Sequence, residues 1–187
     1  MKNFYDEIVR LTETNGGSWG INHTKRLMKL IAIIADDQVY NEEVLWMAAH
    51  THDWGAYAGW RQDGVDHVER SLQVVGSFLE EREYQQELIV EVLDCIANHH
   101  SERNDLSLEA TLLRDADAVD FLGVVGVMRN FSRNPKDMRK GFQMGLEKRQ
   151  KLPSVLVLPK AKEMAEKRIV EMDSLLSLFE SDSWGYY

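Results

Sequence analysis

The 187-residue sequence predicts an all-α fold, and three observations support that prediction. Proline, which interrupts helices, occurs only three times and never before residue 135. The composition is otherwise that of a helix-forming globular protein, with 44% hydrophobic and 28% charged residues. No stretch alternates convincingly between apolar and polar residues, as a half-buried strand would. A chain of this length fits a single domain, residues 1–187, with a sizeable core.

Capping residues and glycine turns set the expected helix boundaries. The predicted helices cover approximately residues 3–14, 18–35, 42–52, a segment ending at 82, 85–99, 107–129, 136–149 and 160–180. Their expected caps are Ser18, Asn41, either Asp63 or Asp66, and Ser107. The turn Asn15-Gly16-Gly17 separates the first two helices, Pro135 marks a later break, and Pro153 and Pro159 bracket the apolar residues 155–158.

Charge is distributed unevenly along the chain. The formal charge of −9 argues against a general binder of nucleic-acid polymers or of anionic membranes. It does not exclude a phosphorylated small molecule, provided that a metal ion supplies local positive charge. Residues 133–168 hold eleven of the 22 basic residues and only four acids, so they carry about +7 and the remainder about −16. This basic segment is either a solvated helical face or a guide for an anionic substrate or partner subunit.

The cysteine count and the apolar runs exclude further classes. The one cysteine, Cys95, rules out a disulfide framework and a cysteine-based zinc finger, and its mid-helix apolar position indicates core packing. The first ten residues lack the apolar region of a signal peptide. No apolar run approaches the roughly 18–20 residues of a membrane span. We therefore expect a cytoplasmic protein without membrane contact.

The histidines indicate where a site lies, because all six fall within the first hundred residues. Several predicted helices place an ionisable side chain in phase with their apolar stripe: these side chains are His23, His52, His99, Asp117 and Asp120. Burying several such groups is costly unless they share a cation, which offsets negative charge and binds neutral imidazole. His50 and His100 lie off their stripes and are interpreted as structural. His67 shares a face with Arg70 and Ser71 that is either solvated or the wall of a pocket, and Asp115 is interpreted as a solvated helix charge.

Several common catalytic templates are missing from the sequence. It contains no His-Glu-x-x-His zinc peptidase motif and no Glu-x-x-His pair of a di-iron bundle. It also lacks the Gly-x-x-x-x-Gly-Lys-Ser/Thr phosphate loop. The chemistry therefore rests on the histidine and aspartate residues themselves.

The ordered set His23, His52-Asp53 and Asp117 resembles the H…HD…D pattern of the HD-domain metal-dependent phosphohydrolases. The flanking residues also resemble this family, in His23-Thr-Lys-Arg26-Leu and in Ala48-Ala49-His50-Thr51-His52-Asp53-Trp54-Gly55. Further segments resemble a bacterial branch that includes nucleotide pyrophosphohydrolases: they are residues 66–71, 96–99 and 115–123. The resemblance covers about residues 18–130, and the helices of residues 136–180 are expected to pack on this HD-domain helical bundle. His50 and the aromatic loop after Asp53 depart from the family pattern.

The resemblance implies one divalent metal ion held by His23, His52, Asp53 and Asp117. Imidazole and carboxylate ligands suit Mn, Fe, Ni, Co or Zn, and Mg is a further candidate. Asp53 would also orient the attacking water, and Asp120 would orient a ligand or pocket residue. His67 and His99 would bind phosphate, act as general acid or hold a second metal. Arg26 and Arg70 are candidate phosphate contacts.

The resulting hypothesis is hydrolysis of a phosphate ester or anhydride in a nucleotide or another small phosphorylated metabolite. One alternative is a regulatory module that binds metal or nucleotide in the same pocket without turnover. Another is a binuclear iron oxygenase built on the HD fold, which requires two metal ions per chain. The sequence leaves the substrate, the native metal and a homodimeric state open.

Overall fold

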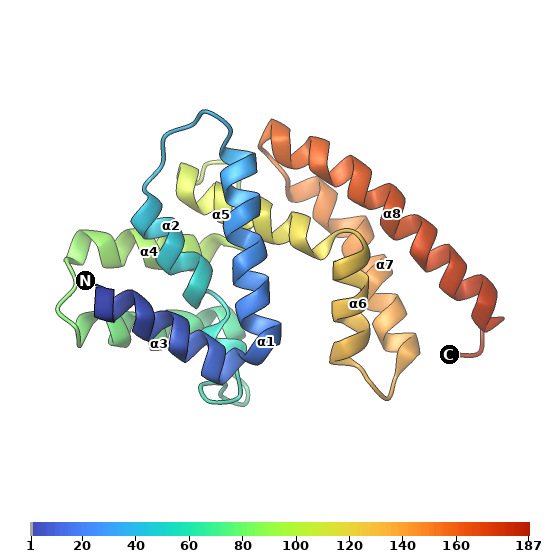
Figure 1. Ribbon diagram of the computed structural model, residues 1–187, viewed down its shortest axis with the longest axis horizontal. Coiled ribbons are helices and arrows are strands. Elements are labelled where there is room, and N and C mark those ends of the chain that lie inside the picture. Colours follow the sequence, from blue (N-terminus) through green and yellow to red (C-terminus); the bar gives the residue numbers. More distant parts are fainter. Residues whose placement is uncertain (1) are drawn as a thin grey trace. The chain divides into compact units, whose positions relative to one another are not determined.

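All regular secondary structure in the described residues is helical, which confirms the all-α prediction. The computed structural model describes residues 2–187, with side chains from Phe4 onward (Figure 1). The chain divides into two compact units, Met1–Arg114 and Asp115–Tyr187, which are described separately below. The single domain expected over residues 1–187 stays a prediction. None of the helices within residues 2–187 has the length and apolar character needed to cross a bilayer.

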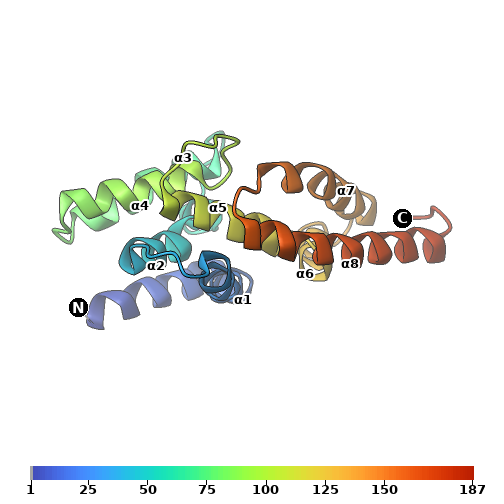
Figure 2. The same ribbon diagram turned by 90° about the horizontal axis from the view of Figure 1, so that it is seen from above.

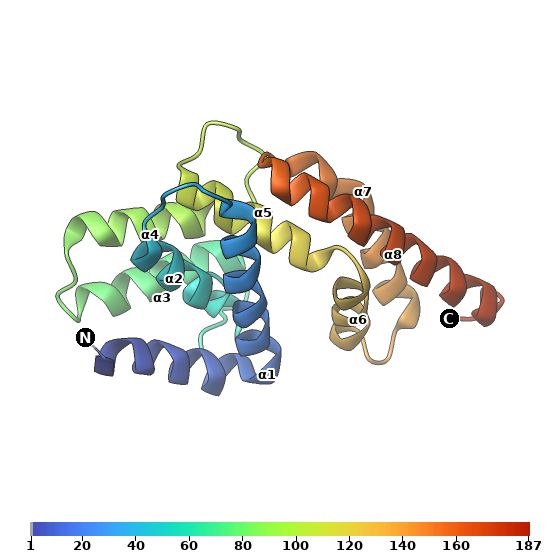
Figure 3. The same ribbon diagram turned by 45° about the horizontal axis from the view of Figure 1, so that its top comes forward.

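The first unit begins with a bent helix, α1 (Lys2–Ala35). Its helical geometry is interrupted at Gly17, where φ is 58° and ψ is −161°. Only glycine adopts such a conformation readily, and the two halves of α1 diverge steeply from this point (Figure 3). The break predicted at Asn15-Gly16-Gly17 is therefore confirmed, and the second half of the helix takes an independent direction across the unit.

The remaining helices of the first unit begin close to the predicted residues. They are α2 (Glu42–Thr51), the short 3-10 helix η1 (Trp54–Ala56), α3 (His67–Glu80), α4 (Gln86–Asn98) and the first half of α5 (Leu108–Phe121). The side chain of Asn41 accepts a hydrogen bond from the Val44 N–H at 3.3 Å, as an N-cap does. Asp66, not Asp63, caps α3, because its carboxylate accepts from the Val68 N–H at 2.8 Å. Helix α2 packs against α1 and α4, and α3 packs against α4 (Figure 2).

A chain of buried hydrogen bonds ties α1 to the end of α2. The indole N–H of Trp54 donates to the Thr12 hydroxyl at 2.9 Å, and that hydroxyl donates to the His50 carbonyl oxygen at 3.0 Å. Further along α1, the Thr24 hydroxyl donates to the carbonyl oxygen of Ala49 at 3.3 Å. Backbone groups near the C-terminus of α2 are thereby anchored from two points on α1, which fixes where α2 ends.

Gly55 lies where η1 and the start of α3 approach each other most closely. A Cβ atom at this position would collide with the His67 carbonyl oxygen and come within 2.5 Å of the Ser71 backbone nitrogen. The Gly55 N–H donates to the buried Ser71 hydroxyl at 2.8 Å, which holds the two segments together. The absence of a side chain here lets α3 begin beside the residues that follow His52.

The second unit contains the end of α5 and the helices α6 (Val124–Arg133), α7 (Met138–Val155) and α8 (Pro159–Ser183). All three pairs among α6, α7 and α8 are in contact (Figure 1). The prediction of one helix over residues 107–129 is wrong, because α5 ends at Phe121 and α6 starts at Val124. Gly123, between the two helices, has φ 84°. It packs against Arg168, because a Cβ added to Gly123 would lie 3.3 Å from the Arg168 Cβ.

The loop between α7 and α8 is held by a buried carboxylate. Oδ2 of Asp115 accepts from the backbone N–H groups of Val157 at 3.0 Å and Leu158 at 2.8 Å. Asp115 is fully buried, so its interpretation as a solvated helix charge is wrong. Pro153, expected outside a helix, lies in the last turn of α7. Pro159 opens α8 at its first position, where a proline loses no hydrogen bond.

We expect Gly55→Ala to destabilise the protein by roughly 1–3 kcal/mol, because the new methyl group overlaps backbone atoms that cannot move independently. Urea unfolding followed by circular dichroism measures this difference. Gly76→Ala is the matched control, since its Cβ would make only an ordinary 3.6 Å contact with Leu93. Equal stability of the two variants would show that the close approach at Gly55 is relaxed in solution.

Candidate metal centre

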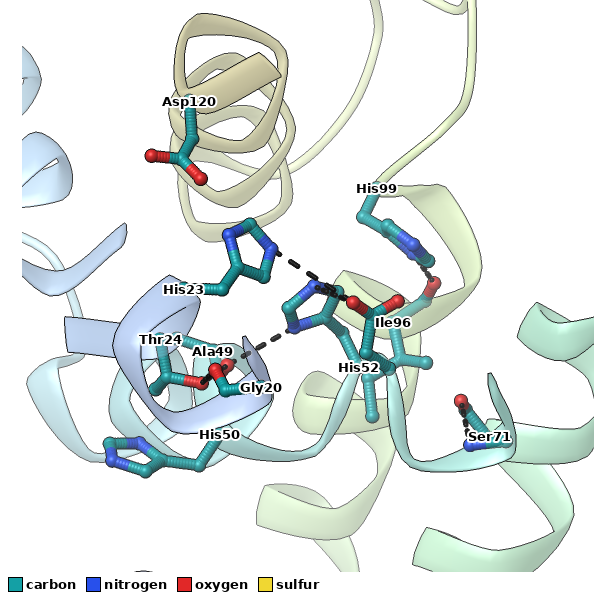
Figure 4. Close-up of polar contacts among 12 residues, drawn as sticks. Gly20, His23, Thr24, Ala49, His50, His52, Ser71, Ile96, His99 and Asp120 are labelled. Carbon is teal, nitrogen blue, oxygen red and sulfur yellow. Dashed lines mark hydrogen bonds and ion pairs between the residues drawn. The ribbon is translucent and has the colours of Figure 1, made fainter. Parts of the chain in front are cut away.

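Three buried side chains with metal-ligand chemistry converge in the first unit. His23 comes from the second half of α1, His52 is the C-cap residue of α2, and Asp53 follows it directly. Their exposed fractions are 0%, 2% and 7%. Oδ2 of Asp53 lies 3.7 Å from Nε2 of His52 and 4.0 Å from Nε2 of His23, as the dashed contacts from both rings show (Figure 4). The structure thus brings together three of the four predicted metal ligands.

The geometry of this group fits a divalent transition metal. One ligand atom from each residue lies within 4.8 Å of the others. Two ligand atoms about 2.1 Å from one ion are separated by roughly 3 Å at a 90° angle and about 4.2 Å at 180°, and both distances fall within this range. Nδ1 of His52 donates to the Ala49 carbonyl oxygen at 3.1 Å, so the neutral ring presents the lone pair of Nε2 toward Asp53. His52 can therefore bind a metal ion through Nε2 without moving the proton on its Nδ1.

A second group of three histidines adjoins the first. His67, His99 and His100 also place ring nitrogens within 4.8 Å of one another. Nδ1 of the buried His99 donates to the Ile96 carbonyl oxygen at 2.6 Å, and its buried Nε2 has no hydrogen-bond partner among the described residues. The His99 ring lies 5.0 Å from that of His52 and 4.0 Å from that of His100. The two groups are therefore neighbours in one row of imidazoles.

His100 is a residue that the sequence reasoning missed. It was assigned a structural role because it falls off the apolar stripe of the preceding helix. That helix, α4, ends at Asn98, so helical phase no longer applies to His100. Two signals in the sequence pointed to His100: its adjacency to His99 at the helix end, and the resemblance of His67, His99 and His100 to the extra histidines of binuclear HD proteins.

His50 has the structural role that the sequence reasoning gave it. Its ring stacks on Trp46 at a centroid distance of 3.8 Å, and its Nδ1 donates to the Trp46 carbonyl oxygen at 2.7 Å. Burial lowers the pKa of His50 to about 4, so the ring is neutral at pH 7. It belongs to neither histidine group.

The predicted aspartates of α5 lie in the second unit. Asp117 is 3% exposed, and Asp120 is fully buried. Asp120 accepts a hydrogen bond from Nη1 of Arg129 at 2.8 Å, and this pair is also a salt bridge. Sequence reasoning missed Arg129, because one continuous helix would place it on the face opposite Asp120, and the break between α5 and α6 lets the two side chains meet. The roles of Asp117 as a metal ligand and of Asp120 as an orienting residue stay predictions.

The two predicted phosphate contacts differ in their surroundings. Arg70 donates through Nε to the Trp60 carbonyl oxygen at 2.7 Å and through Nη1 to Gln73 at 3.0 Å. It also lines a pocket of about 400 Å³ whose walls include the stacked rings of Trp54 and Trp60. Arg26 is half-buried on α1, three residues beyond His23. Phosphate binding by Arg26, Arg70 and His67 stays a prediction.

Comparison with known proteins identifies the family. The sequence profile of the HD domain matches residues 20–122, more than half of the chain, and this range contains His23, His52, Asp53, His67, His99 and Asp117. The chain belongs to the HD-domain family. The resemblance to the HD-domain family is thereby confirmed, whereas the nucleotide pyrophosphohydrolase branch stays a prediction. Membership in the HD-domain family supports a metal-dependent hydrolase function. No curated protein sequence matches the chain significantly.

Solved structures of several bacterial proteins have a similar fold. A Lactobacillus plantarum protein matches with a TM-score of 0.75 and 18% identity, covering 98% of this chain and 95% of its own. Bacillus subtilis YpgQ, solved in complex with ADP, matches with a TM-score of 0.72 and 22% identity over 95% of this chain and 94% of its own. A predicted HD-superfamily hydrolase from an uncultured Thermotogales bacterium matches with a TM-score of 0.67 and 24% identity, covering 96% of this chain and 92% of its own.

We expect added Mn²⁺ or Zn²⁺ to raise the melting temperature of this HD domain, because a ligand at 100 times its Kd stabilises the folded state by about 2.7 kcal/mol. His52→Ala removes a ligand of this group and should diminish the shift. His50→Gln, two residues earlier and outside both histidine groups, should retain it. Differential scanning fluorimetry with and without a chelator makes the measurement. An undiminished shift in His52→Ala would contradict the assignment of this metal centre.

Proposed function

We propose that this HD domain is a metal-dependent phosphohydrolase that cleaves a phosphate ester or anhydride in a nucleotide or another small phosphorylated metabolite. The observation that carries the proposal is the buried group of His23, His52 and Asp53. Its two neutral imidazoles and one carboxylate suit Mn, Fe, Ni, Co or Zn, and Mg is a further candidate. Asp117 is proposed as the fourth ligand.

Different residues of the first unit can bind the metal ion, orient the attacking water and exclude bulk water. A bound divalent ion supplies a Lewis acid that lowers the pKa of water and stabilises charge on phosphoryl oxygens. Asp53 faces both imidazoles with Oδ2, and its second oxygen can accept a hydrogen bond from the attacking water. The wall of buried helices around these residues excludes bulk water, which strengthens each electrostatic contact.

His99 and His67 are proposed to serve the leaving group. Since Nδ1 of His99 is committed to the Ile96 carbonyl oxygen, its Nε2 is the atom that accepts or donates a proton. His67, at the start of α3, has a third of its side chain exposed and can exchange protons with solvent. One imidazole can therefore hold a proton near the reacting phosphoryl group while the other connects it to water.

The proposal that the substrate carries a phosphoryl group draws support from a relative. Bacillus subtilis YpgQ, which shares the fold at 22% identity, has been solved with ADP. Arg26 and Arg70 are the candidate contacts for phosphoryl oxygens in the first unit, because guanidinium groups bind such oxygens in pairs. Both points support a substrate that carries a phosphoryl group.

In an alternative within the proposal, His67, His99 and His100 hold a second metal ion instead of transferring protons. The buried Nε2 of His99, which finds no partner within residues 2–187, is the specific observation that favours it. Two ions per chain would also satisfy the requirement of a binuclear iron oxygenase, the alternative with a different chemistry. A regulatory module that binds metal and nucleotide without turnover would need only the first group.

We expect the purified protein to release phosphate from some nucleotides or from a generic phosphate ester when Mn²⁺ is added. Asp53→Ala should lower the rate at least about 100-fold, because it removes both a ligand and the contact to the attacking water. Asp63→Ala is the matched control, since that carboxylate is fully exposed in the nearby loop. Tight nucleotide binding without product in the wild-type protein would instead favour the regulatory module.

We expect elemental analysis to separate the two histidine groups. His100→Ala should remove the second equivalent of metal and leave the first, because His100 belongs only to the second group. His23→Ala should reduce the first. A wild-type protein that binds one equivalent under saturating metal would contradict the second site and exclude the binuclear oxygenase.

A further inference from the structure

Three cationic side chains of the second unit gather around the ring of Phe121, the last residue of α5. Nζ of Lys148, on α7, lies 3.3 Å from the ring centre. The guanidinium carbon atoms of Arg129 and Arg133, on α6, lie at 4.4 Å and 6.0 Å from it. All three positive heads are thus within 6.0 Å of one point, although they come from two different helices.

Attraction to the ring does not account for this arrangement by itself. A single cation over an aromatic face gains modest attraction from the ring quadrupole, but three cations at one ring also repel one another. Arg129 is paired with Asp120 at 2.8 Å and is 6% exposed, whereas the side chain of Arg133 reaches solvent. Residues 133–168, which include Arg133 and Lys148, carry a formal charge of about +7. Positive charge is therefore concentrated around Phe121 as well as in the sequence.

A buried amide side chain whose oxygen and nitrogen make no hydrogen bond within residues 2–187 lies between α6 and α7. Asn130 follows Arg129, is fully buried, and within residues 2–187 neither its Oδ1 nor its Nδ2 makes a hydrogen bond. Its Nδ2 would be 4.0 Å from a Cβ on Gly145, which is one helical turn before Lys148. Buried amides are normally satisfied by protein, water or ligand, so Asn130 offers an additional polar group between α6 and α7.

We propose that Arg133 and Lys148, placed around Phe121, form a binding site for a phosphate-class anion. A phosphoryl group carries up to two negative charges and several acceptor oxygens, so it can bridge an ammonium and a guanidinium group from different helices. Arg129 contributes positive charge while remaining paired with Asp120. The anion is a free phosphate or polyphosphate, and the site does not depend on the proposed hydrolysis.

Isothermal titration of the full-length protein with inorganic phosphate and tripolyphosphate tests the site. A chelator in one series removes metal, so that binding measured there is independent of the metal centre. We expect Lys148→Met and Arg133→Gln each to weaken binding at least 10-fold. The exposed Arg133 side chain makes Arg133→Gln safe for folding, which circular dichroism verifies. Lys140→Met, an exposed lysine on the same helix α7, is the control with the same change of net charge.

The results separate the site from non-specific charge effects. Absence of binding in the chelated wild-type protein, or equal weakening by Lys140→Met, would overturn the proposal. The chelated titration decides the site even if the protein hydrolyses nothing.

Discussion

Burial of the Asp53 carboxylate between two imidazoles is the constraint on which the first unit depends. Removing a carboxylate from water costs several kcal/mol unless partners or a cation compensate it. His52 and His23 approach it at 3.7 Å and 4.0 Å, from the end of α2 and from the second half of α1. These two elements meet there because α1 bends at Gly17 and because buried hydroxyls of α1 hold the last carbonyl groups of α2. Gly55 then allows α3 to start beside the same residues.

The same hydrogen bond from a histidine ring to the backbone occurs at the ends of α2 and α4. His52 and His99 are the C-cap residues of α2 and α4, and each donates through Nδ1 to the carbonyl oxygen three residues earlier. The bond satisfies a carbonyl that a helix end leaves without an intrahelical partner, and it fixes the tautomer that presents Nε2. Because the C-terminal end of a helix carries partial negative charge, both ends also favour a cation nearby. Backbone geometry and metal chemistry therefore favour the same arrangement.

The sequence predicted those parts of the structure that depend on neighbouring residues. Caps such as Asn41 act within one turn, and the phase of an apolar stripe already places His23 on the buried face of its helix. Three features were missed because they depend on distant residues or on helix ends. Gly123 breaks the predicted helix next to Arg168, although a lone glycine costs only about 1 kcal/mol in a helix. Asp115 binds backbone groups more than forty residues away, and His100 lies beyond the end of α4.

The formal charge of −9 does not conflict with a phosphate-binding protein once charge is considered locally. In the first unit, the buried Asp53 carboxylate requires positive charge, which a divalent ion supplies and which then attracts phosphoryl oxygens. In the second unit, positive charge is provided directly by side chains around Phe121. Net charge governs the long-range approach of a ligand, and salt screens it beyond about 10 Å. At contact distance, the arrangement of a few charged groups decides whether an anion binds. An acidic protein can therefore bind an anion wherever a metal ion or a basic side chain already neutralises its own nearby carboxylates.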